Sequence, residues 1–248
     1  MKRESFGSRL GFILVSAGCA IGIGNVWKFP YICGAYGGAA FILIYLCFLV
    51  ILGIPVLVAE FAVGRGSHTS VAKCFDKLAP AGSCWKPLKF IGIIGCYMLM
   101  MFYTTVGGWM IYYCVKSLRG DFVGATPEAV TQSFSDMLGN APTMMLWMVI
   151  ICLIGFAVCF MGLQNGIEKI SKVMMSALLI IMVILAVHSV MMEGAGEGIS
   201  FYLIPDFQKI KEAGVGNVVF AALSQSFFTL SIGIGAMLIF GSYLDKSR

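Results

Sequence analysis

Long segments without charged residues alternate with short polar segments along the chain. Charged side chains are absent from 10–27, 29–59, 90–115, 137–167, 173–192 and 213–244. An α-helix needs about 20 apolar residues to cross the hydrocarbon core of a bilayer. The pattern therefore predicts six membrane helices, at about 10–34, 38–64, 88–117, 143–162, 168–192 and 214–243.

These segments are apolar on every face, whereas the strands of a membrane β-barrel alternate between apolar and polar positions. The composition agrees, with 59% hydrophobic residues, 12% charged residues and a mean hydropathy of +0.92. Soluble domains have about 25% charged residues. We expect an all-α integral membrane protein in which residues 1–248 form a single transmembrane domain.

Lysine and arginine are distributed unevenly between the two sides of the predicted helices. The side that carries both chain ends holds Lys2, Arg3, Arg9, Arg65, Lys73, Lys77, Lys86, Lys89, Lys169, Lys172, Lys246 and Arg248. The opposite side holds Lys116, Arg119, Lys209 and Lys211. Because positively charged loops stay in the cytoplasm, we expect a multi-pass protein of the cell membrane with both termini cytoplasmic. No small-residue cleavage site precedes Trp27, so we expect the first segment to be retained.

The sequence lacks the motifs of enzymes. His68 and His188 have no partners at metal-ligand spacing, and the nine cysteines form no C-x-x-C pair. The H-E-x-x-H, G-x-S-x-G and P-loop patterns are absent as well. We therefore expect neither catalysis nor nucleotide hydrolysis, and any transport would draw its energy from a gradient. The small net charge of +5 does not suggest nucleic-acid binding.

Two of the predicted helices share a glycine-interrupted segment. The first reads Ala-Ile-Gly-Ile-Gly-Asn at 20–25, and the sixth reads Ser-Ile-Gly-Ile-Gly-Ala at 231–236. Glycine in a helix interior costs about 1 kcal/mol relative to alanine, so these pairs favour local unwinding. Broken helices in transporters direct half-helix N-termini at anionic substrate groups and freed carbonyls at cations. The alternative is that Gly18 and Gly22 form a close-packing face between two helices.

Two polar residues next to the first glycine pair favour the binding site over simple packing. The amide of Asn25 is costly in hydrocarbon unless a backbone group or an ion is its partner. Lys28 follows three residues later, and it either reaches the outer surface with its long side chain or lines a water-filled vestibule.

Several motifs in this order resemble the neurotransmitter:sodium symporter family, in its bacterial amino-acid-transporting branch. The motifs are Arg9-Leu10-Gly11-Phe12-Ile13-Leu14, Gly24-Asn25-Val26-Trp27-Lys28-Phe29-Pro30-Tyr31, Gly37-Gly38, Gly53-Ile54-Pro55, Glu60-Phe61-Ala62-Val63-Gly64-Arg65, Gly166-Ile167-Glu168-Lys169, Pro205-Asp206-Phe207 and Gln225-Ser226-Phe227-Phe228-Thr229-Leu230-Ser231. The resemblance extends over all six predicted helices.

The resemblance implies a fold of two inverted five-helix repeats, with helices one and six broken at mid-membrane. The first repeat would occupy 10–192, and 214–243 would be the first helix of the second repeat. The fold is thus expected to be truncated after that helix. Either the sequence is a fragment, or a second polypeptide supplies helix seven onward. We expect the 248 residues alone to show no sodium-driven uptake, because later helices supply further sodium ligands and an acidic outer-gate partner.

The resemblance also assigns two sodium sites. The first would use the Ala20 carbonyl, the Asn25 side chain and Thr229. The second would use the carbonyls of Gly18 and Ile21. Hard cations prefer such oxygen ligands. Chloride dependence stays undecided: Tyr45 and Gln225 match residues near the family's chloride site, but the deciding residue belongs to the seventh helix.

The substrate site follows from the same alignment. Amides near Ile23 and Gly24 and the Tyr103 hydroxyl would receive a carboxylate, while carbonyls near Ala20 and Phe228 would receive an ammonium group. The side-chain end would be lined by Leu99, Tyr103, Phe228, Ser231 and Ile234, with Thr229 and Gly22 at the same site. The gates would comprise Arg3, Phe6, Lys28, Tyr103 and Phe228.

Gly22 indicates the substrate class. Monoamine carriers of the family have an aspartate at this position, because their substrates lack a carboxylate. Gly22 therefore favours an amino acid, and the apolar lining favours a neutral one. Ile234 replaces a phenylalanine of the leucine-carrying relative, which leaves volume for a large or aromatic side chain. Glu60 would either brace the unwound segments or pair with Arg65, and the sequence does not separate these alternatives.

Three departures from the family pattern limit the transfer of roles. Phe6 replaces an inner-gate tryptophan, Lys28 replaces an arginine, and Ser176 stands where many relatives have a helix-breaking proline. Two functions remain at this point. The first is sodium-coupled symport of an amino acid by alternating access. The second is a non-transporting membrane scaffold or half-subunit that needs a second chain.

Overall fold

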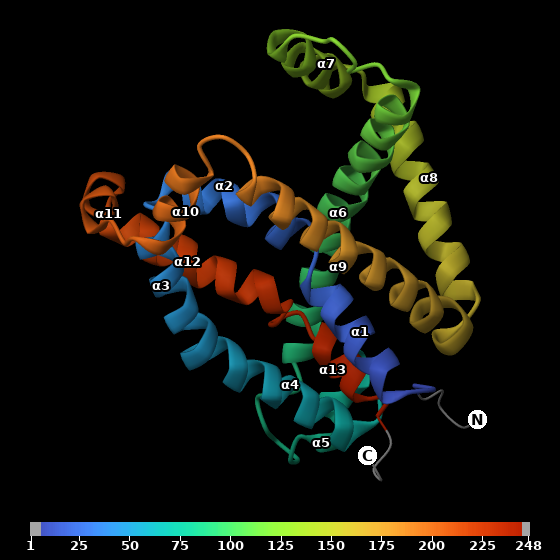
Figure 1. Ribbon diagram of the computed structural model, residues 1–248. Coiled ribbons are helices and arrows are strands. Elements are labelled where there is room, and N and C mark those ends of the chain that lie inside the picture. Colours follow the sequence, from blue (N-terminus) through green and yellow to red (C-terminus); the bar gives the residue numbers. More distant parts are fainter. Residues whose placement is uncertain (1–5, 245–248) are drawn as a thin grey trace. The chain divides into compact units, whose positions relative to one another are not determined.

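A computed structural model describes residues 6–244, and all regular structure in that range is helical (Figure 1). The α-helices are α1 (Arg9–Ala20), α2 (Phe29–Ala35), α3 (Ala39–Phe48), α4 (Ile54–Ser67), α5 (Val71–Leu78), α6 (Leu88–Arg119), α7 (Pro127–Gly139), α8 (Ala141–Phe160), α9 (Lys169–Val190), α10 (Ala195–Leu203), α11 (Phe207–Ala213), α12 (Val215–Leu230) and α13 (Ala236–Gly241). Three π-helical segments adjoin them: η1 (Gly24–Lys28), η2 (Leu49–Gly53) and η3 (Leu163–Glu168).

The long apolar helices overlap the six ranges expected from the sequence. Among the described residues, four helices are long and apolar enough to cross a membrane: Ala39–Ser67, Leu88–Arg119, Ala141–Phe160 and Leu163–Val190. Two bent pairs pass the same criteria, Arg9–Ala20 with Gly24–Ala35 and Phe207–Ala213 with Val215–Leu230. The second bend differs from expectation, because α11 is joined to α12 at 100°. The assignment of each helix to a membrane span stays a prediction.

The chain divides into two compact units. Residues 1–92 and 163–248 form the first unit, and 93–162 form the second. Helix α6 begins in the first unit and continues into the second.

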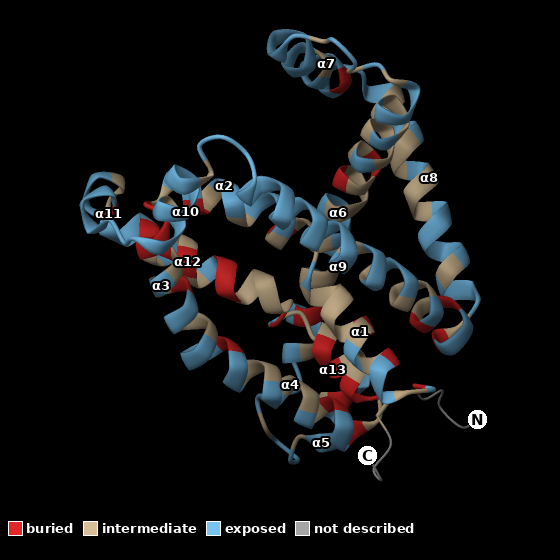
Figure 2. Ribbon diagram, viewed as in Figure 1, coloured by how far each residue is buried: buried red, intermediate tan, exposed pale blue. Residues whose placement is uncertain are grey.

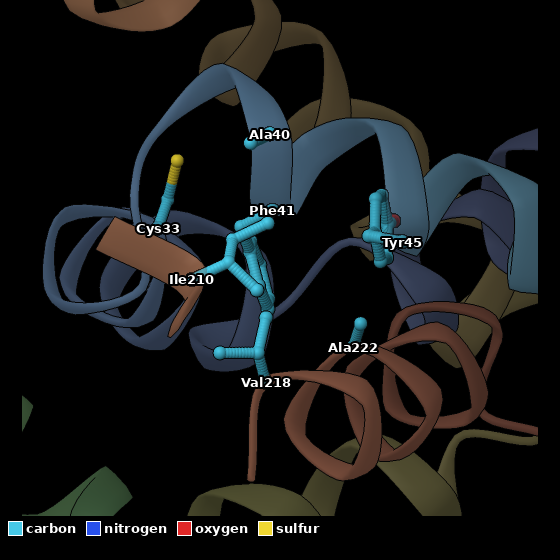
Figure 3. Close-up of a cluster of buried hydrophobic side chains, with 7 residues drawn as sticks. All are labelled: Cys33, Ala40, Phe41, Tyr45, Ile210, Val218 and Ala222. Atoms are coloured by element: carbon cyan, nitrogen blue, oxygen red, sulfur yellow. The ribbon is translucent and has the colours of Figure 1, made fainter. Parts of the chain in front are cut away.

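A buried cluster joins α2, α3, α11 and α12 in the first unit (Figure 3). Phe41 is its largest fully buried member, and Val218 and Ala222 of α12 belong to the same cluster as Phe41 of α3. Burying a large apolar side chain contributes about 1.5–3 kcal/mol, so this cluster fixes α12 against α3. Helix α12 carries much of the sequence-predicted site, and its position therefore depends on this core.

Helix α13 packs closely against α4 in the first unit. A side-chain carbon on Gly64 would lie 2.1 Å from the carbonyl oxygen of Leu238, and one on Gly241 would lie 2.8 Å from that of Phe61. Both distances are shorter than any real carbon contact. Glycine on each helix thus permits the approach of the two backbones.

Helices α8 and α9, both within the described part of the chain, contain no buried residues, and their ribbons are tan and pale blue in Figure 2. Their exposed side chains are mostly apolar, including Phe156, Phe160 and Leu179. An apolar surface of this kind is typical of helices that face lipid or other helices.

In the second unit, α6 and α8 pack through glycine, and α7 packs on an aromatic cluster. A side-chain carbon on Gly108 would lie 2.9 Å from the backbone nitrogen of Met148. Trp109 and Tyr113 of α6 contact the ring of Phe134 on α7, with centroid distances of 5.7 and 6.2 Å. These aromatic contacts hold α7 at the end of α6.

Four short helices lie where the sequence indicated only loops: α5, α7, α10 and α11. Local capping explains two of them. The Thr126 side chain accepts from the amide of Ala129 at the start of α7, and the Asp206 side chain accepts from Gln208 and Lys209 at the start of α11. Such caps stabilise a helix start by about 1 kcal/mol.

Candidate sodium and substrate site

The first expected helix is broken where the glycine pattern predicted. Helix α1 closes with the hydrogen bond from Ile21 N to Ala17 O, the chain bends at 21–22, and η1 begins at Gly24. The axes on the two sides of the break differ by 50°. The part after the break continues through η1 into α2.

The sixth expected helix is broken as well. Helix α12 ends at Leu230, and α13 begins at Ala236. Between them, Ser231, Gly233 and Gly235 have φ angles of 51°, 90° and 77°, all in the left-handed region. Glycine adopts this region without strain, which explains why the second glycine pair breaks the helix. Residues with a side chain rarely adopt this region, as Ser231 does, and the Ser231 hydroxyl makes a hydrogen bond that offsets part of the strain.

Direct hydrogen bonds join the two breaks. The Ser231 hydroxyl donates to the carbonyl of Cys19 at 2.8 Å. The Thr229 hydroxyl donates to Asn25 Oδ1 at 3.1 Å, and Asn25 Nδ2 donates to the carbonyl of Ala20 at 3.0 Å. The three expected groups of the first sodium site, on Ala20, Asn25 and Thr229, therefore lie together.

Thr229 also receives two hydrogen bonds, one from Tyr45 of α3 and one from Gln225 of its own helix α12. The Tyr45 hydroxyl donates to Thr229 Oγ1 at 3.1 Å, and Gln225 Nε2 approaches the same oxygen at 3.4 Å. Gln225 Nε2 also donates to the carbonyl of Gly24 at 3.1 Å. Tyr45 and Gln225, the residues matched to a chloride site, thus use these donors to hold Thr229 and the start of η1.

Two side-chain oxygens near the breaks lack a hydrogen-bond donor within residues 6–244. Glu60 Oε2 and Gln225 Oε1 are buried and have no hydrogen-bond partner among the described residues. The described residues also contain no group of three or more His, Cys, Asp or Glu side chains suited to a metal ion. Carbonyl, amide and hydroxyl oxygens suit a hard monovalent cation, and they are unsuited to a transition metal.

The ring of Phe228 packs directly on Gly24, where there is no room for a side chain. A side-chain carbon on Gly24 would lie 2.0 Å from a ring carbon of Phe228. Lys28 Nζ lies 5.2 Å from the centroid of the same ring, which is the range of a cation–π interaction. Lys28 is exposed and lines a cavity of about 390 Å³ between α2 and α12, together with Gln225. Which of its two alternative roles Lys28 has stays a prediction.

Gly22 faces open space, in contrast to Gly24. A side-chain carbon on Gly22 would meet no atom within 4 Å among the described residues. Packing within the described chain therefore does not require glycine there. The empty volume lies beside the first break, where the resemblance places a substrate.

Glu60 braces the second break. Its Oε1 accepts from the backbone amide of Gly233 at 2.6 Å. Of the two alternatives left open for Glu60, the structure thus shows the contact with an unwound segment. The sequence could not show this, because 173 residues separate the partners.

The remaining predicted residues lie in several places. Gly18 and Ile21 lie in the last turn and at the cap of α1, and a side-chain carbon on Gly18 would lie 3.2 Å from Met175 of α9. Their role as sodium ligands stays a prediction. Helix α9 is continuous through Ser176, which agrees with the absence of a proline.

The other residues expected in the gates and the substrate pocket lie in different parts of the chain. Phe6 is buried, and its ring contacts Phe12 and Tyr243. Arg3 lies outside the described residues. Leu99 and Tyr103 lie on α6 in the second unit, and their part in the site stays a prediction. Ile23 precedes η1, and Ile234 lies in the second break.

Comparison with known proteins identifies the class. Residues 3–132 and 128–248 match the sodium:neurotransmitter symporter family. The chain is 36% identical over 247 residues to the sodium-dependent transporter YhdH of Bacillus subtilis, covering 100% of this chain and 54% of that protein. It is 32% identical to a sodium-dependent transporter of Haemophilus influenzae, covering 55% of the relative.

A solved structure agrees with the sequence relatives. The structure of MhsT in complex with L-phenylalanine matches with a TM-score of 0.90 and 36% identity, covering 100% of this chain and 55% of MhsT. The chain belongs to the sodium:neurotransmitter symporter family. It spans about half the length of the relatives it matches.

Proposed function

We propose that this chain forms the first six helices of a symporter that couples sodium entry to uptake of a neutral amino acid. The protein would lie in the cell membrane with both termini cytoplasmic. The carrying observation is the meeting of Ala20, Asn25 and Thr229 across two helix breaks. Chain segments more than 200 residues apart supply the two sides of one oxygen-rich site.

A sodium ion at this site would replace the hydrogen bonds among its oxygens. The Asn25 amide connects the three oxygens, because its Nδ2 donates to Ala20 O and its Oδ1 accepts from Thr229 Oγ1. Rotation of the Asn25 amide and the Thr229 hydroxyl would direct all three oxygens at the ion. Ligands from later helices would complete its coordination. A second ion at the Gly18 and Ile21 carbonyls is part of the same proposal.

The substrate would bind beside the first break. The open space at Gly22 adjoins the start of η1, where amides near Ile23 and Gly24 favour a carboxylate. The similar protein MhsT was solved in complex with L-phenylalanine, which is an amino acid with a large apolar side chain. This supports an amino-acid substrate here, with Phe228 as one wall of the pocket.

Alternating access would use the same breaks. Non-helical residues 21–22 separate α1 from η1 and α2, and residues 231–235 separate α12 from α13, so the inner halves can tilt without the outer halves. Binding energy of the ion and substrate at the breaks would favour one tilt over the other.

The test is the sodium dependence of uptake in the full-length protein. Asn25→Ala and Thr229→Ala each remove one oxygen ligand, so each should raise the sodium concentration for half-maximal uptake by about tenfold or more. Matched controls are Asn217→Ala and Thr104→Ala. Within the described residues, the Asn217 side chain donates to the carbonyl of Ala213 at the end of α11, and the Thr104 hydroxyl donates to the carbonyls of Met100 and Met101 in the preceding turn of α6.

The controls should retain the parental sodium dependence. If Asn25→Ala and Thr229→Ala behave like the controls, the assignment of the first sodium site is wrong. If no amino acid is taken up in the presence of a sodium gradient, the proposed function is wrong.

A further inference from the structure

Glu168 is a buried carboxylate that the proposed site does not use. It ends η3 and directly precedes α9, and only 3% of its surface is exposed. A carboxylate rarely becomes buried unless charged and hydrogen-bonding partners surround it. The hydrogen-bond partners of Glu168 therefore indicate its role.

Three donors surround the Glu168 carboxylate. The backbone amide of Gly7 donates to Oε2 at 2.9 Å, and the Ser8 hydroxyl donates to Oε1 at 3.0 Å. Lys172, one turn further along α9, donates to Oε1 at 2.7 Å. Two of the three donors thus come from the segment just before α1, about 160 residues away in sequence.

Gly11 makes room for this carboxylate. A side-chain carbon on Gly11 would lie 1.9 Å from Glu168 Oε1 and 2.3 Å from the carboxyl carbon. Any larger residue at position 11 would displace the Glu168 carboxylate from this position. Ser8 reinforces the geometry, because its side chain accepts from Gly11 N and caps α1 while its hydroxyl donates to Glu168.

The contact fixes only the inner half of the broken helix. Phe6 and Val15 are buried in a cluster with Leu163 of η3, next to the Glu168 contact. The hydrogen bonds from the N-terminal segment to Glu168 come from Gly7 and Ser8, on the inner side of the break. A tilt of α1 at the break would therefore have to release Glu168 first.

We propose that Glu168 is the positioning residue that holds the inner half of the first helix closed. Its carboxylate acts as a latch on Gly7, Ser8 and Gly11, and Lys172 neutralises its charge when the latch is closed. The inference rests on the proposed alternating access, since it assigns the release of this latch to inward opening. A substitution that weakens this contact would then slow uptake, because the inner half of the first helix would return more slowly to its closed position.

A buried reporter beneath the latch measures the opening directly. Val15 is 3% exposed, and Val15→Cys places a thiol of similar size in the same cluster. The full-length protein in native membranes is treated with N-ethylmaleimide in sodium buffer. Residue-resolved mass spectrometry then follows the alkylation of this reporter thiol and of the native cysteines.

In the Val15→Cys background, Glu168→Gln should raise the alkylation rate of the reporter thiol by about tenfold, because charge-assisted hydrogen bonds to Gly7, Ser8 and Lys172 are lost or weakened. Cys33 is the internal control. It is fully buried in the separate cluster around Phe41, so local opening at α1 should leave its alkylation slow.

Two results would overturn the proposal. One is an unchanged alkylation rate of the reporter thiol in the Glu168→Gln protein. The other is a parallel rise at the reporter thiol and at Cys33, which would show that Glu168 supports the whole fold and has no separate role at α1.

A second variant approaches the latch from the opposite side. Gly11→Ala places a methyl group inside the carboxylate position and should also raise alkylation of the reporter thiol while leaving Cys33 protected. Because both changes break one contact, combining them should give a rate no faster than that of the faster single change. Fully additive effects would contradict the latch.

This readout does not require transport. Faster alkylation in a protein that takes up no amino acid would support the latch and reject the proposed function. Unchanged alkylation in an active symporter would reject the latch alone.

Discussion

The hydroxyl of Ser231 donates a hydrogen bond to the carbonyl of Cys19 at 2.8 Å. Cys19 lies in the last turn of α1, and Ser231 is the first residue beyond α12. One bond thus joins the two breaks, and it satisfies a carbonyl in the last turn of α1. Ser231 also has a φ angle of 51°, which is strained for a residue with a side chain.

Two substitutions at position 231 separate these effects. Ser231→Ala removes the hydrogen bond and keeps the left-handed strain, so it should lower the free energy of unfolding by about 1–2 kcal/mol. Ser231→Gly removes the same bond and relieves the strain, so it should be destabilised less. Thermal unfolding of the purified full-length protein in detergent measures the order. An alanine variant more stable than the glycine variant would contradict the account.

Gly22 provides a test of the substrate's carboxylate. Gly22→Asp introduces a negative charge beside the proposed carboxylate position, where low dielectric strengthens repulsion, and it should abolish amino-acid uptake. Gly22→Ala is the matched control. Since an added carbon meets no described atom within 4 Å, this variant should still bind substrate.

Radiolabelled uptake at several substrate concentrations distinguishes the two variants. Retained uptake at parental affinity in Gly22→Asp would reject the amino-acid assignment. Equal loss in both variants would show that volume at position 22 matters and charge does not.

Both helix breaks could be predicted from sequence because their cause is local. Pairs of glycines at 22 and 24 and at 233 and 235 weaken a helix wherever it packs. The structure adds Ser231, whose left-handed conformation no propensity would indicate. Its partner at Cys19 is 212 residues away, so only the fold brings the two together.

The contacts of the charged residues could not be predicted, because they depend on packing between distant segments. Glu60 had two plausible partners in the sequence, and only the fold distinguishes Gly233 from Arg65. The sequence motif around Glu168 was recognised without a role, because its partners Gly7 and Ser8 are about 160 residues away in the sequence. The roles of Leu99 and Tyr103 rest on the resemblance alone.

The proposed apolar lining of the substrate pocket predicts which amino acids bind. Phe228 and Ile234 offer no partner for a charged side chain, and a buried unpaired charge costs several kcal/mol. Leu, Phe, Tyr and Trp should therefore displace a bound label better than Asp, Glu, Lys and Arg. They should also displace it better than Gly and Ala, because the small residue at 234 leaves volume for a large side chain.

A competition assay with the full-length protein ranks these amino acids. Stronger displacement by Gly and Ala than by the large residues would reject the size preference. Stronger displacement by a charged amino acid would reject the apolar pocket.

Cys74 provides a test of the packing of α5. It is fully buried beside Val71 and Leu238, and burial raises the pKa of its thiol. A thiol reacts with iodoacetamide as the thiolate, so alkylation of Cys74 should increase at higher pH than alkylation of an exposed thiol. Cys84, which is exposed in the same connecting region, is the matched control. Coincident pH profiles for Cys74 and Cys84 would contradict the packing of α5 against α4 and α13.

The central claim is that sodium and an amino acid share one site at the two helix breaks. Equilibrium binding of labelled L-phenylalanine or L-leucine to the purified full-length protein, in sodium chloride and in potassium chloride of equal strength, tests it most directly. The account predicts saturable binding in sodium and its loss in potassium, because Ala20, Asn25 and Thr229 then have no ion to coordinate beside the substrate. Equal affinity in the two salts would contradict it.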